Sequence, residues 1–394
     1  MRNISSIICC GCGNCVQGCP IKCIQMVQDL SGFWKARCDG SKCINCGKCI
    51  ELCPMIALQS DKKKPIAMFA AAAKDKVSYQ SGSSGSVFPQ LAKFVLSKQK
   101  GYVWGCGYNE SLLPVHKETH SLEQLDDLCR SKYVQSYIGD ANKGVQSRLQ
   151  EGNRVLFAGT PCQVSGLRKF LGKDYQGLYL VDLVCHGVPS AEMFRNNIKY
   201  IERSRRKKLS RYEFRLKSSN VNSRHYTYTY IYHDGMKEVR PYYEDAYYNA
   251  FYDMVSLNES CYCCPYACSS RTGDLTIGDF EWGKKYHHEL KEFGAISSIL
   301  VNTQKGEEML RWIEGDMFLI PTEWNYIVEK NLNLIRPTPR PEYRDRIYKE
   351  INEWGYDAWA KKYFHSLRYI KKLPFMAPFV KIKIFWNNIV KIDK

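Results

Sequence analysis

One cysteine pattern occurs twice near the start of this 394-residue chain and constrains its fold more than any other feature. The two copies read Cys9-x2-Cys12-x2-Cys15-x3-Cys19-Pro20 and Cys43-x2-Cys46-x2-Cys49-x3-Cys53-Pro54. Three thiolates at this spacing bind three irons of a cubane, whereas the fourth cysteine, before the proline, lies too far along the turn and binds the neighbouring cluster. The pattern therefore predicts two adjacent 4Fe-4S clusters that carry electrons.

Each predicted cluster takes ligands from both copies. The first cluster is expected to use Cys9, Cys12, Cys15 and Cys53, and the second Cys43, Cys46, Cys49 and Cys19. Structural zinc is the alternative, but zinc sites generally use two separated cysteine pairs per ion. A disulfide framework is disfavoured for two reasons. A chain of this length can bury a hydrophobic core without disulfide bonds, and its N-terminus does not resemble a secretory signal. Unpaired cysteines and oxygen-sensitive clusters indicate a reducing cytoplasm.

Cysteine density falls sharply after the second copy, which indicates a module boundary. We expect a two-cluster ferredoxin domain over residues 1–60, a linker over 61–78, a larger domain over 79–330 and a basic aromatic extension over 331–394. The linker contains the charge run Asp61–Pro65, which neither packs nor continues a helix. The net charge of +17 favours an anionic cofactor, an acidic electron carrier or a membrane surface as partner. Only this charge supports nucleic acid, and no apolar stretch is long enough to span a membrane.

The middle of the chain predicts a βαβ unit. Val155–Gly159 is a short apolar run, and Thr160-Pro161 then supplies a helix N-cap with proline at the first helical position. The helix is expected to end near Leu171, before Gly172, and Leu178–Val184 is expected to be the next buried strand. A right-handed crossover makes the two strands parallel, so their carboxyl ends share the edge where open sheets bind ligands.

Cysteines follow both strands of this unit. Cys162 and Cys185 lie just beyond the carboxyl ends, and Cys162 occupies a first helical turn, where free amides favour a thiolate. Further on, Cys261 and Cys264 have the spacing of a cluster loop with proline directly after. Together the four predict a third thiolate site, with Cys263 and Cys268 as competing ligands for the loop positions. Burial as small core residues is the alternative for Cys162 and Cys185.

Three other segments have two interpretations each. Ser81–Ser86 precedes a helical segment, Val87–Leu96, and predicts either a backbone site for an anionic or planar group or a flexible loop. Tyr226–Tyr232, before an Asp-Gly turn, predicts a β-hairpin whose tyrosines form a packed surface or an aromatic platform. The basic run Arg203–Lys208 is a solvated helix end or a docking site for an acidic electron donor.

The motifs occur in a familiar order. They are Ser83–Phe88, Ser131–Ser136, Gly159–Gln163, Val181–Ser190, Cys261-x2-Cys264 and Gly273–Asp279. In this order they resemble the coenzyme F420 hydrogenase/dehydrogenase beta-subunit family over about residues 1 to 290. The likeness is closer to its bacterial branch, which has an N-terminal two-cluster ferredoxin domain and is often met among polysaccharide-biosynthesis proteins.

The resemblance implies the fold class and the cofactors. The fold is expected to be mixed, α+β or α/β, with a small ferredoxin-like domain followed by a larger α/β domain that binds noncovalent FAD beside a third 4Fe-4S cluster. The third cluster would be held by Cys162, Cys185, Cys261 and Cys264. The candidate flavin contacts are Ser83, Ser84, Gly85 and Lys132, although a lone lysine beside an aromatic is ordinarily a surface residue. His186 either donates a proton near the flavin or merely caps its strand.

The resemblance also implies the activity. The chain is expected to be an oxidoreductase that passes electrons from a ferredoxin-type donor through its clusters to FAD and reduces a small organic substrate, in polysaccharide biosynthesis. The alternatives are an electron-transfer subunit that serves a partner oxidoreductase and a beta subunit that uses coenzyme F420.

Three features depart from the family or extend beyond it. Ser86 stands where the family has a second glycine, and its side chain is expected to crowd the cofactor. Glu281 is inserted before Trp282 and is expected to displace it. The segment 371–386 mixes lysines with large apolar residues, so it either contacts the inner face of the membrane or packs as an ordinary helix on the domain.

Overall fold

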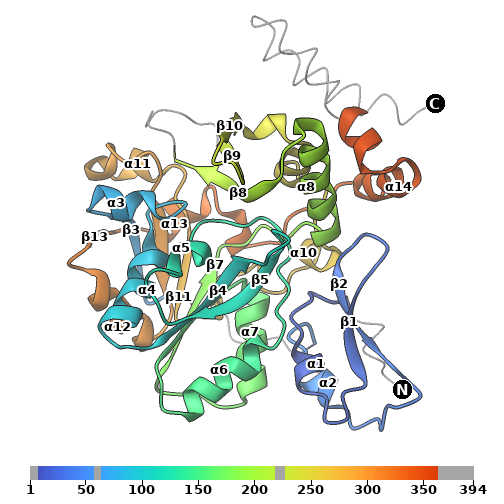
Figure 1. Ribbon diagram of the computed structural model, residues 1–394. Coiled ribbons are helices and arrows are strands. Elements are labelled where there is room, and N and C mark those ends of the chain that lie inside the picture. The colour runs from blue at the N-terminus through green and yellow to red at the C-terminus, as the bar shows by residue number, and fades with distance from the viewer. Residues whose placement is uncertain (1–7, 57–63, 218–226, 363–394) are drawn as a thin grey trace, which may run out of the picture.

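The computed structural model describes residues 8–56, 64–217 and 227–362 (Figure 1). The cysteine-rich region lies at one side of a larger domain and consists of two short helices and a hairpin. Its elements are α1 (Asn14–Gln17), β1 (Ile24–Gln28), β2 (Trp34–Cys38) and α2 (Lys48–Glu51). Each helix begins after a glycine with positive φ, Gly13 or Gly47, so both cysteine loops turn in the same way.

The larger domain is built on an eight-stranded mixed sheet with the order β13-β3-β12-β11-β7-β6-β4-β5. The inner strands β11, β7, β6 and β4 are parallel, whereas β12, β3 and β13 on one side and β5 on the other pair antiparallel. The strands are β3 (Ala67–Ala73), β4 (Tyr102–Tyr108), β5 (Pro114–Thr119), β6 (Val155–Gly159), β7 (Leu178–Leu183), β11 (Leu275–Asp279), β12 (Ser297–Val301) and β13 (Met317–Pro321). The expected mixed α/β class behind a small cysteine-rich region is confirmed.

Helices cover both faces of this sheet (Figure 1). One face packs α4 (Val87–Ser97) and α12 (Gln304–Ile313) over a core that includes Leu91 and Ile299. The other packs α6 (Ala141–Gln150) and α7 (Pro161–Leu171) over a core that includes Phe157. The remaining helices of this domain are α3 (Lys76–Gln80), α5 (Leu125–Leu128), α11 (Gly283–Tyr286), η3 (His288–Leu290), α13 (Trp324–Val328) and η4 (Leu332–Leu334).

The predicted βαβ unit is confirmed. Strands β6 and β7 are parallel neighbours, with Val155 opposite Leu178. Helix α7 between them begins with a capping box formed by Thr160 and Gln163 and ends at Gly172, whose φ is 68°.

A smaller antiparallel sheet stands beside the main one and has its own aromatic core. Its strands are β8 (Leu209–Leu216), β9 (Thr227–Tyr232) and β10 (Lys237–Pro241), in the order β10-β9-β8. The associated helices are α8 (Ala191–Arg205), η2 (Tyr242–Glu244), α9 (Ala246–Tyr252), α10 (Glu259–Tyr262) and α14 (Arg344–Trp354). Tyr228, Tyr230 and Tyr232 are all buried in this core. The tyrosine stripe is therefore a packed surface over its described residues, while Tyr226 lies outside them.

Two expected segment boundaries differ from the structure. The linker expected over residues 61–78 contains strand β3. The run Ala67–Ala73 is uncharged and rich in alanine, and it pairs between strands β12 and β13 of the sheet. The expected extension from residue 331 is continuous with the domain as far as residue 362, since Ile347, Tyr348 and Trp359 pack into the aromatic core.

The sequence also singles out two basic segments, residues 203–208 and 371–386. Within Arg203–Lys208, Arg203, Lys207 and Lys208 each form an ion pair with an acidic side chain, so much of the run's charge is neutralised. The tail segment 371–386 lies outside the described residues. Over the described ranges, no helix combines the length and apolar character that crossing a bilayer requires.

Candidate cofactor site

The four sulfurs predicted for the first cluster lie together. Cys12, Cys15 and Cys53 are buried, and Cys9 is half-buried. Burial raises the pKa of the Cys15 thiol to about 12, and the neighbouring Cys9 and Cys53 sulfurs add to this effect. Cys12 in turn adjoins Cys9 and Cys15. The crossed ligand set, in which one cysteine comes from the second copy, stays a prediction, because Cys49 of the second copy also lies near Cys15.

The sulfurs predicted for the second cluster are more exposed than those predicted for the first. Burial raises the pKa of the Cys49 thiol, with further contributions from Cys43 and Cys46 beside it. Cys46 is exposed on the surface. The fourth predicted ligand, Cys19, is in contact with Cys23, a cysteine that the repeated pattern does not include.

A cavity of about 310 Å³ opens at the carboxyl ends of the central parallel strands. This volume falls at the lower end of the roughly 300–1,000 Å³ typical of small-molecule sites. The predicted ligands of the third cluster all line it: Cys162, Cys185, Cys261 and Cys264. The βαβ unit therefore places its two cysteines on the expected edge, and the α10 segment adds the other two.

These four sulfurs are mutual neighbours. Burial raises the pKa of Cys185 to about 12, with Cys162 and Cys264 adding to the rise. Burial likewise raises the pKa of Cys264 to about 12, with Cys162 again beside it. A hydrogen bond with the Cys10 thiol and burial both raise the pKa of Cys162 above the ordinary value, and so oppose the effect expected from the free amides of the first helical turn.

The competing loop cysteines do not line the cavity. The thiol of Cys263 is exposed and donates to the carbonyl of Glu259 at 3.6 Å. The thiol of Cys268 donates to the carbonyls of Pro265 and Ser270, at 3.6 and 3.4 Å. Neither side chain lines the cavity, so the geometry favours Cys261 and Cys264.

A buried ion pair stands against the four-cysteine group. Arg271 and Asp182 have side chains 1% and 0% exposed and approach to 3.4 Å. Asp182 also accepts hydrogen bonds from the Thr272 and Gly273 amides, at 2.9 and 3.1 Å, and so fixes the loop before β11. The guanidinium lies close enough to Cys185 to oppose the rise in its pKa. A fixed positive charge beside four sulfurs suits an anionic metal–thiolate centre.

Main-chain contacts join the first cysteine group to this cavity. Asn258, which caps α10, donates through Nδ2 to the Cys9 carbonyl at 3.4 Å. Lys169 of α7 donates to the Cys53 carbonyl at 2.8 Å. The Cys10 thiol contacts both Cys12 of the first group and Cys162 of the cavity. The two sulfur groups are therefore adjacent across the junction.

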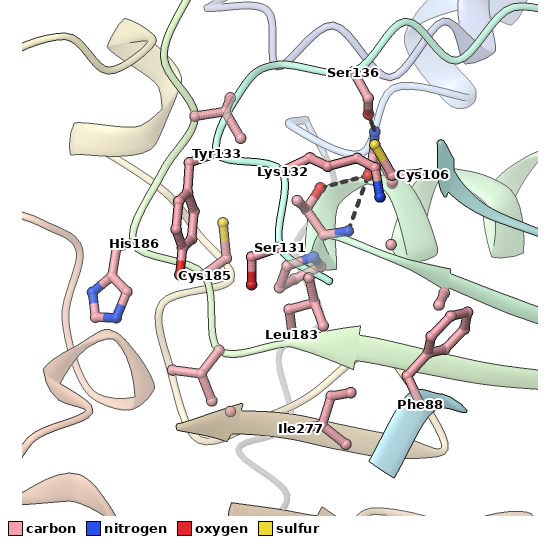
Figure 2. Close-up of a pocket in the computed structure, with 18 of the residues that line it drawn as sticks. Phe88, Cys106, Ser131, Lys132, Tyr133, Ser136, Leu183, Cys185, His186 and Ile277 are labelled. Atoms are coloured by element: carbon pink, nitrogen blue, oxygen red, sulfur yellow. Dashed lines mark hydrogen bonds between the residues drawn. The ribbon is translucent and has the colours of Figure 1, made fainter. Parts of the chain in front are cut away.

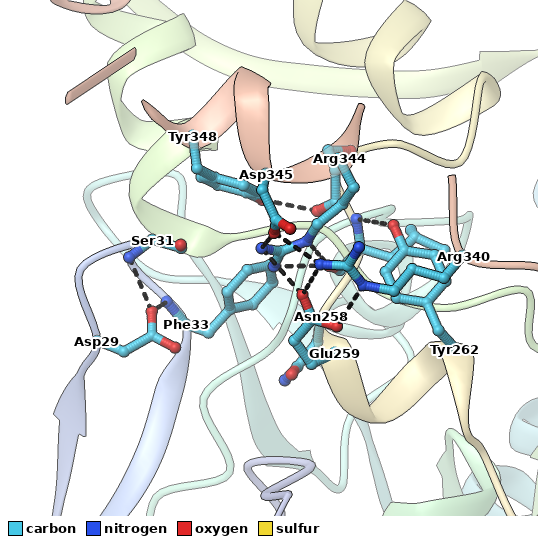
Figure 3. A network of polar contacts seen from close by, with 12 residues as sticks. Asp29, Ser31, Phe33, Asn258, Glu259, Tyr262, Arg340, Arg344, Asp345 and Tyr348 are labelled. Atoms are coloured by element: carbon cyan, nitrogen blue, oxygen red, sulfur yellow. Dashed lines mark hydrogen bonds and ion pairs between the residues drawn. The ribbon is translucent and has the colours of Figure 1, made fainter. Parts of the chain in front are cut away.

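A polar network joins the α10 segment to the residues that follow it later in the chain (Figure 3). Arg340 grips the Glu259 carboxylate with two hydrogen bonds of 2.9 Å, and Arg344 approaches the same carboxylate at 3.1 Å. Arg344 also lies over the rings of Tyr348 and Phe33, at 4.6 and 5.8 Å from their centroids. Phe33 belongs to the cysteine-rich hairpin, so the network ties that hairpin and helix α14 to the loop that carries Cys261.

Three of the four predicted flavin contacts line the same cavity, namely Ser83, Ser84 and Lys132. Figure 2 shows Lys132 and Cys185 among the side chains of this one cavity. The Ser83 hydroxyl accepts from the Ser131 amide at 2.6 Å, which ties the serine loop to the segment that carries Lys132. Gly85 does not line the cavity and instead supports the loop, donating from its amide to Ser297 Oγ at 2.8 Å.

Lys132 is not an ordinary surface lysine. Its ammonium donates to the Cys129 carbonyl at 2.9 Å and lies 5.4 Å from the centre of the Tyr108 ring. Burial lowers its pKa from the ordinary lysine value, partly opposed by the nearby Cys106 and Asp127.

Of the two residues that depart from the family pattern, Ser86 lines the cavity and Trp282 does not. Ser86 adopts a left-handed conformation, and its hydroxyl donates to the Tyr79 carbonyl at 2.6 Å. The hydroxyl is therefore hydrogen-bonded within the protein. Trp282 lies outside the cavity lining, 38% exposed, with the Lys330 ammonium 3.9 Å from its ring centroid.

His186 lies at the cavity wall (Figure 2). Burial lowers the pKa of His186, and the charge of Asp279 partly opposes this. Burial acts to raise the pKa of Asp279, but the Arg215 guanidinium, 2.6 Å away, outweighs it and holds the pKa below the ordinary value. The imidazole is therefore neutral at neutral pH beside an ionised carboxylate.

Sequence reasoning missed several cavity residues. They are Cys10, Cys106, His116, Arg130 and Arg215. Arg215 is the next-to-last residue of strand β8 and has no flanking motif, and the Asp279 with which it pairs is far away in sequence. For Cys10, its position directly beside a predicted ligand was the one available signal.

Comparison with known proteins gives one family match. Residues 152–319 match the family model that describes the C terminus of the coenzyme F420 hydrogenase/dehydrogenase beta subunit. Among solved structures, the chain is similar to one from the F420-reducing NiFe hydrogenase complex of Methanosarcina barkeri, with a TM-score of 0.46 and 15% identity, over 78% of this chain and 93% of that chain. That likeness supports no statement about function. A comparison with curated proteins found no match.

Proposed function

Because residues 152–319 match the model for the C terminus of the coenzyme F420 hydrogenase/dehydrogenase beta subunit, we propose that this chain is an iron–sulfur flavoprotein oxidoreductase. In this proposal, electrons from a ferredoxin-type donor pass through the clusters to FAD, which reduces a small organic substrate. The observation that carries the proposal is one cavity lined both by four neighbouring cysteines and by the serine loop and Lys132.

The residues of the cavity fit both groups. Cys162, Cys185, Cys261 and Cys264 supply four thiols to one site, which is the donor set of a cubane. Arg130, Lys132 and Arg215 also line the cavity. Arg130 and Arg215 are ion-paired with acidic side chains, so Lys132 is the cation of this set that would meet an anionic group of the cofactor. When bound, the clusters would carry single electrons, and the flavin would exchange hydride with the substrate.

The chain's own side chains would orient and protonate the substrate. His186 is neutral at neutral pH, so its imidazole can take up and return a proton. Asp279 stays ionised through its pairing with Arg215, and its charge would stabilise the protonated imidazole. Lys132 offers an ammonium within the cavity, and a positive charge beside a flavin favours its reduced form.

The exposure of the two N-terminal sulfur groups indicates where electrons would enter the chain. Cys46 is exposed, whereas the first sulfur group is largely buried and adjoins the cavity through Cys10. A donor would therefore dock at the second cluster, where Lys42 and Lys48 are exposed and suit an acidic carrier. The bacterial relatives suggest a precursor of polysaccharide biosynthesis as the substrate, and this part of the proposal rests on the resemblance alone.

Metal and flavin analysis of the anaerobically purified chain tests the proposal. We expect about twelve irons and matching sulfide per chain for three cubanes, together with about one FAD. Cys264→Ala should lose about four of these irons. Cys263→Ala, one residue away but facing outward, is the matched control and should retain all of them. Zinc without iron in the wild-type protein would refute the redox function.

Activity then separates the enzyme from the electron-transfer subunit. The reduced chain alone should reduce organic acceptors, including glycan precursors, with product formation followed by mass spectrometry. If turnover requires a partner oxidoreductase while the iron and flavin contents are as expected, the chain is a subunit that feeds that partner. Reduction of coenzyme F420 by the reduced chain would identify the third alternative.

A further inference from the structure

Two cysteines outside the repeated pattern lie among the sulfurs of the predicted second cluster. Cys23 Sγ is 3.6 Å from Cys19 Sγ and 3.8 Å from Cys38 Sγ. The sulfurs of Cys23, Cys38 and Cys43 all lie within 4.8 Å of one another. Each of the two extra thiols is therefore close to a different predicted ligand of the same cluster.

The hairpin holds both extra cysteines in place. Cys23 directly precedes β1, and its carbonyl accepts from the Asp39 amide at 2.8 Å. Cys38 ends β2 and lies opposite Ile24 in the register of the two strands. Cys23 is only 5% exposed. These sulfurs are thus fixed beside the cluster site by paired backbone rather than carried on a loose loop.

Packing alone does not account for this arrangement. A cysteine that serves only as a small apolar residue needs no sulfur for a neighbour. Here the two thiols bridge the space between the ligand from the first copy, Cys19, and a ligand from the second copy, Cys43. The Cys19 and Cys23 sulfurs are 3.6 Å apart, and the Cys38 and Cys43 sulfurs lie within 4.8 Å of each other. In both pairs a side-chain rotation could bring either sulfur to the same metal.

We propose that Cys23 and Cys38 are reserve ligands of the second cluster, with Cys23 able to replace Cys19 and Cys38 able to replace Cys43. This inference rests on the clusters of the proposed function. In the exchange, the incoming thiol releases its proton to solvent as its sulfur binds iron. The outgoing thiolate takes up a proton as its iron–sulfur bond breaks, so no electron is transferred.

The proposal predicts a difference among ligands of one cluster. Cys19 and Cys43 each have an extra thiol nearby. Cys46 is exposed, and among the described residues the close group of sulfurs includes Cys43 but not Cys46. Reserve ligands at this end of the chain would preserve the cluster where solvent and oxidants reach its thiolates.

Iron counting on the full-length chain, reconstituted anaerobically with iron and sulfide, tests the proposal. Cys19→Ala and Cys43→Ala should each keep the wild-type iron content. The double variants Cys19→Ala/Cys23→Ala and Cys43→Ala/Cys38→Ala should each lose about four irons. Cys46→Ala is the matched control and should also lose about four. In the single variants, the electron paramagnetic resonance signal of the reduced second cluster should change shape, because a different sulfur binds the same iron.

Loss of about four irons from Cys19→Ala alone would overturn the proposal, as would full iron in Cys46→Ala or in both double variants. Retention of the other clusters shows that a variant has folded, so unfolding is not mistaken for loss of a ligand. Failure of the proposed function is distinct, since it would appear as missing iron in the wild-type protein.

Discussion

A methyl group at Gly85 would collide with the main chain of strand β3. An ideal Cβ at this position lies 2.0 Å from the Ala71 carbonyl oxygen and 2.9 Å from the Ser297 nitrogen. Gly85 follows Ser83 and Ser84, two of the proposed flavin contacts. Gly85→Ala therefore tests whether this loop must lie directly on the sheet to form the cavity.

The size of the effect follows from the geometry. Real Cβ atoms essentially never come within 3.0 Å of another heavy atom, so the loop and the strand must separate by about 1.0 Å, the difference between 3.0 and 2.0 Å. Strand β3 is paired on both sides and cannot yield, so the loop must move. The shift strains two hydrogen bonds, from Gly85 N to Ser297 Oγ at 2.8 Å and from Ala73 N to Gly85 O at 2.9 Å. Overpacking and weakened buried hydrogen bonds together cost about 3–6 kcal/mol.

Denaturant unfolding and flavin content measure the two consequences. Gly85→Ala should lower the free energy of unfolding by the amount above and should reduce the bound flavin per chain. Its iron content should stay at the wild-type value, because no predicted metal ligand lies on this loop. Gly315→Ala is the matched control, since a Cβ there meets nothing within 4 Å, and it should change stability by less than about 0.5 kcal/mol. If Gly85→Ala unfolds like the control and binds flavin fully, the close approach is not a requirement of the site.

Two further predictions concern buried polar groups. Burial, with smaller effects from Arg215 and Arg130, lowers the pKa of Lys217 to about 7. The unfolded chain, with a lysine pKa of about 10.4, holds more protons between these values, so this group adds stability as pH rises from about 7 to 10, by at most about 1.4 kcal/mol per pH unit. Lys217→Met should remove that part of the slope in denaturant titrations at pH 7 and 9, and an unchanged slope would refute the assignment. Asp245 accepts from the Tyr230 hydroxyl at 2.8 Å inside the aromatic core. Measured by thermal unfolding, Tyr230→Phe should lower the free energy of unfolding by about 1–2 kcal/mol. Asp245→Ala leaves several buried donors without an acceptor and should lower it by about 3–5 kcal/mol. Equal losses in the two variants would contradict the network.

Local signals make part of this fold predictable. The βαβ unit can be expected because its helix is specified by neighbouring residues, with Thr160 and Gln163 at the start and Gly172 at the end. The parallel pairing then follows from the handedness of the crossover. The same topology brings Cys162 and Cys185 to one edge, so the sequence alone locates a candidate site there.

Features that depend on distant contacts cannot be predicted in this way. Strand β3 falls in the expected linker, because a run of alanines carries no alternation and its strand character comes from its partners β12 and β13. Cys10, Cys23 and Cys38 do not stand out in the sequence, because they fall outside the repeated spacing. Their significance comes from sulfur neighbours supplied by other parts of the chain.

The proposed function would explain why the cysteine-rich region contacts the large domain on one particular side. One-electron carriers work in series only when neighbouring centres are close, so under this proposal the junction would place one sulfur group against the cavity and leave the other accessible. Asn258 achieves the first requirement, because the residue that caps the loop of Cys261 also binds the Cys9 carbonyl. Exposure of Cys46 at the opposite end meets the second. A variant that loosens the junction, such as Asn258→Ala, should therefore slow electron transfer into the cavity without changing the iron content, whereas an unchanged rate would mean that the junction does not determine the path.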